Sequence, residues 1–169
     1  MPLYFAYGSN MDLAQMAQRC PASRPLGPAR LMRHRFVIMP EGWASVARAP
    51  RGEVWGLLWD LALKDVPALD RYESLHTGLY SKILQTVIAQ PGGPRRALVY
   101  VGRPGEGGVP QPGYMEAILA AAGSLGLPQS YCASLERFLP EVSRKATHLR
   151  YNGKNVRGGT DGGVPARRP

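Results

Sequence analysis

The sequence predicts an α+β domain built on a small mixed or antiparallel β-sheet that could curl toward a barrel. Strand-like and helical segments are mixed without the regular strand–helix–strand repeat of a parallel sheet. Residues 79–89 and 95–102 are joined by Gln-Pro-Gly-Gly-Pro, a strong turn signal, and are predicted to form a hairpin. The stretch 53–61 (EVWGLLWDL) is almost continuously apolar, as in a strand that is buried on both faces or lines a barrel.

The chain opens with a short aromatic strand that ends on a glycine. Residues 4–7 (Tyr-Phe-Ala-Tyr) run into Gly8, and Ser9 and Asn10 are good helix-capping residues. A helix is therefore expected directly after them. Its apolar residues at helical spacing are predicted to share one face: Leu13, Met16, Ala17 and Cys20.

Further strands are expected in the middle of the chain. The Pro-rich stretch 21–28 predicts a connector, and strands are expected over residues 30–39 and 43–49. The second of these is closed by Pro50-Arg51-Gly52. Inside the apolar stretch that follows, Gly56 marks a bend or a close approach of two backbones.

Helical periodicity returns three times after this point. Residues 64–73 carry apolar side chains at helical spacing, with Asp65 as a cap, and place Glu73 at the end of a short helix. The Gly- and Pro-rich residues 103–112 are predicted to form a surface loop. Two more helices are expected over residues 112–125 and 128–139.

Size and composition predict one domain with a tail. The chain has 169 residues, of which 44% are hydrophobic and 20% charged, as in ordinary globular proteins. Residues 1–150 are assigned to the domain, and 151–169 to a basic, Gly/Pro-rich tail that we expect to be mobile. Of the net charge of +9, residues 140–169 contribute seven Lys or Arg against two acids. Because the basic residues gather there, a nucleic-acid partner is not expected.

The remaining signals concern compartment and metals. The chain holds no apolar run long enough to span a bilayer and no basic-then-apolar leader at its start, so a cytoplasmic protein without a membrane partner is expected. Cys20 and Cys132 lie far apart and are predicted to be reduced structural thiols. Neither they nor the three histidines show metal-ligand spacing, so no metal site is predicted.

The turn after the first strand suggests a binding site. Gly8 lets a ligand approach the backbone without a Cβ in the way, and the amides that follow point free N–H groups at one spot near a helix N-terminus. An anion or a polarised carbonyl oxygen would be stabilised there. The alternative is that residues 8–10 form only a turn and a helix cap.

Glu73 is the leading candidate for a catalytic acid or base. At the C-terminal end of a helix, a carboxylate meets the negative end of the helix dipole, which favours a raised pKa. The alternative is a solvated surface glutamate. Asp70 is expected to serve as a cap or an ion-pair partner.

Four sequence blocks together resemble the gamma-glutamylcyclotransferase family. They are residues 4–11 (YFAYGSNM), 53–59 (EVWGLLW), 69–80 (LDRYESLHTGLY) and Tyr114 ahead of Gly-Leu-Pro at 126–128. Each block is short, but the blocks occur in the family's order over residues 3–140.

The resemblance implies a small mixed β-barrel flanked by helices and a cofactor-independent reaction. That reaction releases 5-oxoproline from a γ-glutamyl small molecule when its α-amino group attacks the γ-carbonyl. By position, Glu73 matches the catalytic carboxylate. The implied substrate-binding residues are Tyr4, Phe5, Ala6, Tyr7, Gly8, Ser9 and Tyr114. Two further candidates come from the residues themselves: Asn10, whose amide could bind an anion, and Tyr80, whose hydroxyl could donate to the glutamyl head or to Glu73. The alternative for Tyr80 is an aromatic ring packed in the core.

The sequence leaves several alternatives open. Ser74 follows Glu73 where the family pattern has glycine, so the backbone there could run differently. The leaving group could be an amino acid, an amine or a biosynthetic intermediate. The same pocket could also bind a γ-glutamyl ligand without turning it over, or the basic end could bind RNA or another anion. The oligomeric state is not predicted.

Overall fold

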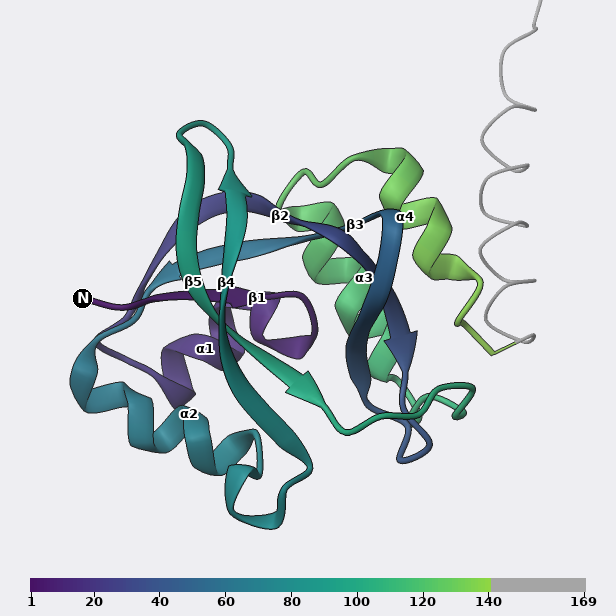
Figure 1. Cartoon of the computed structure of the whole chain (residues 1–169), viewed down its shortest axis with the longest axis horizontal. Coiled ribbons are helices and arrows are strands. Elements are labelled where there is room, and N and C mark those ends of the chain that lie inside the picture. Colours follow the sequence, from purple (N-terminus) through teal and green to yellow (C-terminus); the bar gives the residue numbers. More distant parts are fainter. Residues whose placement is uncertain (141–169) are drawn as a thin grey trace, which may run out of the picture. The chain divides into compact units, whose positions relative to one another are not determined.

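Five strands close into a barrel in the order β1, β3, β2, β4, β5 within residues 1–140, the part of the chain that the computed structural model describes (Figure 1). All neighbouring strands are antiparallel except β1 and β5, which run parallel where Tyr4 lies opposite Leu98. The predicted α+β class with a mixed, barrel-forming sheet is confirmed. The strands are β1 (Leu3–Ala6), β2 (Arg24–Ile38), β3 (Ala44–Asp60), β4 (Tyr80–Ala89) and β5 (Gly93–Gly102).

The two longest strands, β2 and β3, pair as one hairpin, although the sequence suggested shorter pieces. β2 begins at Arg24, inside the stretch predicted to be a connector, and its pairing with β3 shifts between Pro25 and Gly27. β3 continues through Pro50, where the prediction placed a break. Pro50 falls opposite the register shift between Met32 and His34, where the ladder of hydrogen bonds is already interrupted. A proline is tolerated there without ending the strand.

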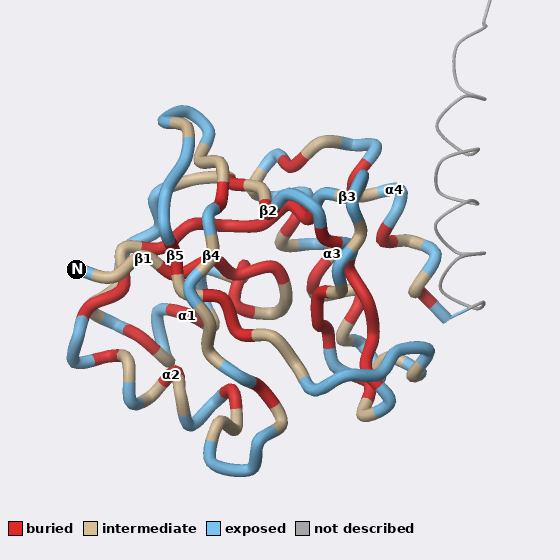
Figure 2. Tube along the Cα trace, viewed as in Figure 1, coloured by how far each residue is buried: buried red, intermediate tan, exposed pale blue. Residues whose placement is uncertain are grey.

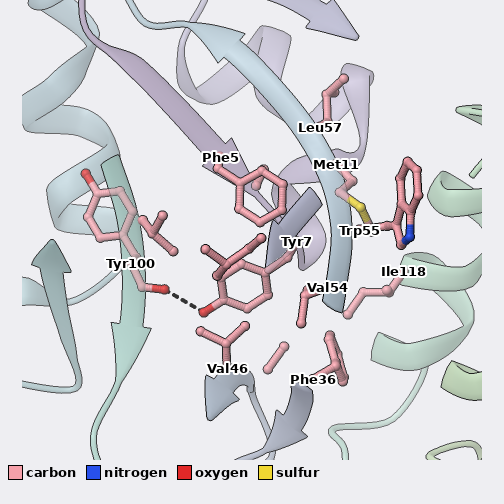
Figure 3. Packing of buried hydrophobic residues seen from close by; sticks show 14 of the residues in the cluster. Phe5, Tyr7, Met11, Phe36, Val46, Val54, Trp55, Leu57, Tyr100 and Ile118 are labelled. Atoms are coloured by element: carbon pink, nitrogen blue, oxygen red, sulfur yellow. Dashed lines mark hydrogen bonds between the residues drawn. The ribbon is translucent and has the colours of Figure 1, made fainter. Parts of the chain in front are cut away.

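The barrel core is built from the apolar stretch of β3 and the aromatic strand β1. Residues 54–59 are all buried, as predicted for a strand inside a barrel (Figure 2). Gly56 marks the expected close approach, because a Cβ at this position would lie 2.1 Å from the Ala6 carbonyl oxygen. Phe5 and Tyr7 pack in this core, and the Tyr7 hydroxyl donates to the Tyr100 carbonyl oxygen at 2.5 Å (Figure 3).

Helices lie on two sides of the barrel, with α3 and α4 together on the right of Figure 1 and α2 at the lower left. All four α-helices were predicted, and each is shorter than the range that the sequence suggested. No helix within residues 1–140 is long and apolar enough to cross a membrane. The helices are α1 (Leu13–Arg19), α2 (Val66–Tyr72), α3 (Tyr114–Ser124) and α4 (Gln129–Glu136), with 3-10 helices at Ser9–Met11, Leu63–Asp65 and Leu75–Thr77.

Helix α1 differs from the prediction in its cap and its buried face. Asp12 is the capping residue, because its Oδ1 accepts from the Ala14 amide at 2.8 Å and the Gln15 amide at 3.1 Å. Ser9 and Asn10 form the preceding 3-10 turn instead. The predicted apolar face is half correct: residues 16 and 20 are buried, whereas residues 13 and 17 are exposed.

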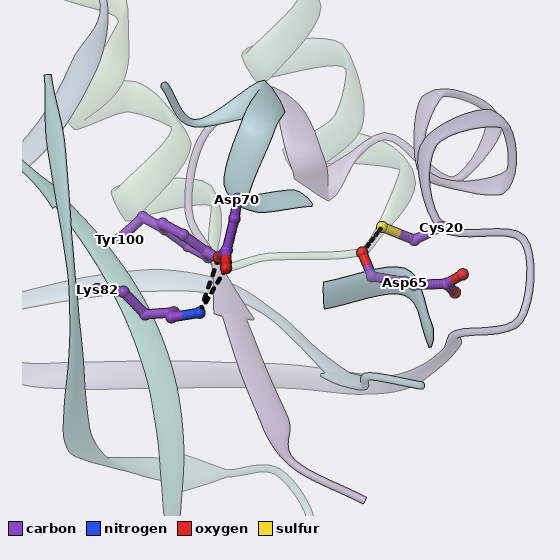
Figure 4. A network of polar contacts seen from close by, with 5 residues as sticks. All are labelled: Cys20, Asp65, Asp70, Lys82 and Tyr100. Atoms are coloured by element: carbon purple, nitrogen blue, oxygen red, sulfur yellow. Dashed lines mark hydrogen bonds and ion pairs between the residues drawn. The ribbon is translucent and has the colours of Figure 1, made fainter. Parts of the chain in front are cut away.

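Two buried or half-buried aspartates attach α2 to its surroundings, and Figure 4 shows the bonds of the second, Asp70. Asp65, predicted as a cap of its own helix, instead accepts from the Ala22 amide at 2.9 Å and the Ser23 hydroxyl at 2.8 Å. Asp70 forms the predicted ion pair, with Lys82 Nζ at 2.8 Å, and also accepts from the Tyr100 hydroxyl at 2.5 Å. These bonds hold the end of α2 against β4 and β5.

Residues 1–139 form one compact unit. The predicted domain limit at residue 150 and the 151–169 tail lie outside the described residues. Cys20 and Cys132 are both free thiols, as predicted, and burial raises the pKa of Cys20 to about 11.

Candidate active site

The turn after β1 and the end of α2 meet through Asn10 and Glu73. The Asn10 side-chain Nδ2 donates to Glu73 Oε1 at 2.8 Å and to the Tyr4 hydroxyl at 3.0 Å. On the other side of the turn, the Ser9 hydroxyl lies 3.0 Å from that of Tyr72. Glu73 is only 9% exposed, so it is not a solvated surface glutamate.

Glu73 lies beside Asn10 because it is the residue directly after the last turn of α2. Its amide donates to the Leu69 carbonyl at 2.9 Å and closes the last turn of the helix. Ser74 then adopts a left-handed conformation with φ of 51°, which glycine adopts more easily. Ser74 therefore adopts the backbone conformation that a glycine would favour at this position, and α2, with Glu73 as its C-terminal cap, ends directly before it.

The turn after Gly8 is a short 3-10 helix, Ser9–Met11. Met11 and Asp12 amides donate to the Gly8 and Ser9 carbonyls at 3.0 and 3.1 Å, which forms the 3-10 helix. The first amides of such a helix have no acceptor within it. The Asn10 carbonyl accepts from Trp59 Nε1 at 3.2 Å, which fixes this turn to the barrel.

Arg19 sets the orientation of Asn10. Its Nη1 donates to Asn10 Oδ1, so the amide nitrogen of Asn10 must face Glu73. Its Nη2 donates to Gln15 Oε1 at 2.6 Å, and its guanidinium carbon lies 3.6 Å from the centre of the Tyr72 ring. Arg19 thus connects α1, the Gly8 turn and the end of α2.

The pKa of Glu73 is raised by its burial. Burial raises the pKa of Glu73 to about 7, against the charge of Arg19 and the side chains of Asn10 and Tyr4, which lower it. At neutral pH such a carboxyl can both take and give a proton. Burial likewise raises the pKa values of Tyr4, Tyr7, Tyr80 and Tyr114, so these hydroxyls stay protonated.

Glu73 lies at the junction of an inner cavity and an outer cleft. Ser9, Glu73, Tyr80 and Tyr114 line both spaces. The inner cavity is also lined by Tyr4, Tyr7, Gly8, Asn10, Ala44 and Tyr100.

Seven of the nine predicted substrate-binding residues therefore share this cavity with Glu73. Phe5 and Ala6 do not line it: Phe5 is fully buried in the core, and Ala6 lies against Gly56. The Tyr80 hydroxyl already donates to the Ala44 carbonyl at 2.7 Å. The Tyr114 hydroxyl accepts from the Ala44 amide at 3.3 Å, which leaves its hydrogen available to a ligand.

Sequence reasoning did not pick out several residues around the site, among them Leu79 of the outer cleft. Tyr100 and Ala44 line the inner cavity, Trp43 and Tyr72 line the outer cleft, and Arg19 orients Asn10. Tyr72 and Leu79 lie within the family-like block 69–80, but nothing in the local sequence marks the other residues. Among the described residues, no three His, Cys, Asp or Glu side chains gather as a metal site requires.

Comparison with known proteins identifies the family. Residues 53–135 match the model of the AIG2-like family. Proteins named gamma-glutamylcyclotransferase from Mus musculus and Bos taurus are 30% and 31% identical over 148 residues, which cover 82% of this chain and 79% of each relative. A solved structure of a gamma-glutamyl cyclotransferase superposes with a TM-score of 0.77 at 28% identity, over 83% of this chain and 89% of that one. The chain belongs to the gamma-glutamylcyclotransferase family.

Proposed function

We propose that this protein releases 5-oxoproline from a γ-glutamyl compound, with Glu73 as the general acid and base. The observation that carries the proposal is the buried carboxyl at the junction of the two spaces, hydrogen-bonded at 2.8 Å to the turn that would bind the substrate. The names of the relatives agree with this reaction.

The inner cavity would bind the glutamyl head. The amides that follow Gly8 and the Tyr114 hydroxyl supply donors for the α-carboxylate or for the oxyanion that forms on the γ-carbonyl. The γ-carbonyl would then lie beside Glu73, with the rest of the substrate in the outer cleft. Folding the flexible glutamyl chain into this position brings its own amine to the carbonyl carbon, and such orientation lowers the barrier substantially.

The reaction needs a proton to move from one nitrogen to another. The ionised Glu73 takes a proton from the α-ammonium, and the resulting amine attacks the γ-carbonyl carbon to form the new C–N bond. Protonated Glu73 then gives its proton to the leaving nitrogen as the old C–N bond breaks. The ring nitrogen loses a second proton to solvent, and the departing amine gains one from solvent. A carboxyl with a pKa of about 7 suits both directions of transfer.

The direct test is a product assay for 5-oxoproline with purified full-length protein and a panel of γ-glutamyl amino acids and γ-glutamyl amines. We expect one equivalent of 5-oxoproline for each equivalent of released amine. Binding of these compounds without product, even on long incubation, would instead support a binding protein.

A further inference from the structure

Asp70 joins α2 to the wall of the inner cavity. Its carboxylate accepts from the Tyr100 hydroxyl at 2.5 Å and from Lys82 Nζ, which lies 2.8 Å from both carboxylate oxygens (Figure 4). Tyr100 lines the inner cavity and is 2% exposed. It lies directly opposite Lys82 where β4 pairs with β5, so both side chains share one face of the sheet and reach the same carboxylate. Burial and the bond to Asp70 raise the pKa of Tyr100, so its hydroxyl stays protonated and continues to donate.

Helix α2 depends on such contacts for its position. It has seven residues, and a helix of this length is not stable by itself in water. It buries Leu69, whereas its other residues are partly or fully exposed. Asp70 lies three residues before Glu73. Its bonds, together with the burial of Leu69, therefore fix the C-terminal half of α2 against β4 and β5.

A second series of contacts connects Asp70 to Glu73 through the cavity wall. The ring of Tyr100 meets the Tyr4 ring edge-on at 5.5 Å between centres. The Tyr4 hydroxyl accepts from Asn10 Nδ2 at 3.0 Å, and the same nitrogen donates to Glu73 Oε1 at 2.8 Å. Asp70 is thus connected to Glu73 both along the helix and around the inner cavity.

We propose that Asp70 is a positioning residue for the cyclisation, which holds the Glu73 carboxyl, through α2 and Tyr100, at the place where it exchanges protons with the substrate. This inference rests on the proposed function. Within the described residues, the lining of neither the inner cavity nor the outer cleft includes Asp70. Its loss should therefore lower kcat rather than raise KM, because a displacement of about 1 Å in a catalytic group can cost about a hundredfold in rate.

Asp70→Ala and Asp65→Ala form a matched pair, because the two aspartates attach opposite ends of α2. Asp65 is the more buried of the two and binds the Ala22 amide and the Ser23 hydroxyl. With a donor that the wild type turns over, Asp70→Ala should lower kcat by about tenfold to a hundredfold and change KM by less than about threefold.

The control variant separates positioning from stability. Asp65→Ala should lower the thermal midpoint at least as much as Asp70→Ala, yet change kcat by less than about threefold at a temperature where both variants are folded. A folded Asp70→Ala protein with wild-type kcat, or an equal loss of kcat in Asp65→Ala, would overturn the inference while leaving the proposed function intact. A wild-type protein that forms no 5-oxoproline from any γ-glutamyl donor would overturn the proposed function and the inference with it.

Three further variants test which bond of Asp70 matters. Tyr100→Phe keeps the ring and should lower kcat nearly as much as Asp70→Ala, so it tests the same contact if Asp70→Ala does not fold. Because both changes break one bond, the double variant should lose less than about threefold more than the larger single loss. Lys82→Met and Asp70→Asn keep an oxygen that accepts from Tyr100, and both should retain more activity than Tyr100→Phe. Losses that multiply in the double variant, or a larger loss in Lys82→Met than in Tyr100→Phe, would contradict the proposed role.

Discussion

The side-chain nitrogen of Asn10 lies 2.8 Å from Oε1 of Glu73 and joins two parts of the chain that are 63 residues apart in sequence. Arg19 fixes the other end of the same amide, and Trp59 binds the Asn10 backbone carbonyl. Asn10 therefore cannot turn its oxygen toward Glu73 without losing its bond to Arg19. The Asn10 side chain thus links the glycine turn directly to the Glu73 carboxyl.

Arg19 is expected to tune Glu73 through charge. Burial raises the pKa of Glu73, and the charge of Arg19 is the strongest of the effects that lower it. Arg19→Met should therefore raise that pKa and move the acidic limb of the kcat/KM profile to higher pH, with activity lost at pH 6 and largely kept at pH 9. Arg19→Lys retains the charge and should return the limb toward the wild-type position. A profile that does not move in Arg19→Met would contradict this role.

Gly8 is expected to keep the inner cavity open. Its φ of −115° is accessible to alanine, but the added Cβ would lie 3.2 Å from the Tyr114 hydroxyl and 3.6 Å from the Ala44 Cβ. Gly8→Ala should therefore lower kcat/KM by roughly tenfold to a hundredfold, while the thermal midpoint changes by only a few degrees. Full activity in a normally folded variant would show that the glutamyl head does not bind here.

The sequence predicted Glu73, Gly8, Tyr7 and Tyr114 as members of one site because they carry a family pattern in order. It did not indicate Arg19. This residue orients Asn10 and stacks on Tyr72 only because α1 packs next to the Gly8 turn and the end of α2. Propensity rules also chose Ser9 and Asn10 as caps, although Asp12 caps α1. Residues 9 and 10 are used in the site instead: one contacts Tyr72 and the other Glu73.

The barrel was predictable mainly where a local signal and burial agree. The apolar run at residues 53–61 corresponds to the last part of β3, which ends at Asp60. The predicted hairpin around Gln-Pro-Gly-Gly-Pro corresponds to β4 and β5. The break expected at Pro50 was wrong, because the cost of a proline in a strand disappears at a register shift. Such a shift depends on the partner strand and is not encoded in the residues around Pro50.

The contact between β1 and β3 gives a stability prediction with a matched control. In Gly56→Ala, the new Cβ would meet the Ala6 carbonyl oxygen at 2.1 Å, so the two strands must separate. We expect a loss of at least about 3 kcal/mol in the free energy of unfolding, measured by chemical denaturation. Gly123→Ala, in α3, meets no atom within 4 Å and should be neutral or stabilising by up to about 1 kcal/mol. Equal effects of the two substitutions would contradict the packing described for β1 and β3.

Glu73 should also make stability depend on pH. Its pKa is raised from 4.5 to about 7 on folding, so the folded state holds a proton that the unfolded state has lost between these values. The stabilisation from that proton is complete below about pH 4.5 and is lost as pH rises through 7. Glu73→Gln has no such titration, so its free energy of unfolding relative to wild type should increase by about 3 kcal/mol from pH 4 to pH 8. A constant difference across that range would mean that Glu73 titrates normally.

The most direct test of the account is 5-oxoproline release by Glu73→Gln beside the wild-type protein, at pH 8 and with a donor that the wild type turns over. Glutamine keeps the size of the side chain but cannot accept the proton of the α-ammonium. We predict that kcat falls by about a hundredfold to ten-thousandfold, while the variant stays folded and still binds the donor. A folded Glu73→Gln protein with wild-type kcat would show that the reaction does not depend on this carboxyl.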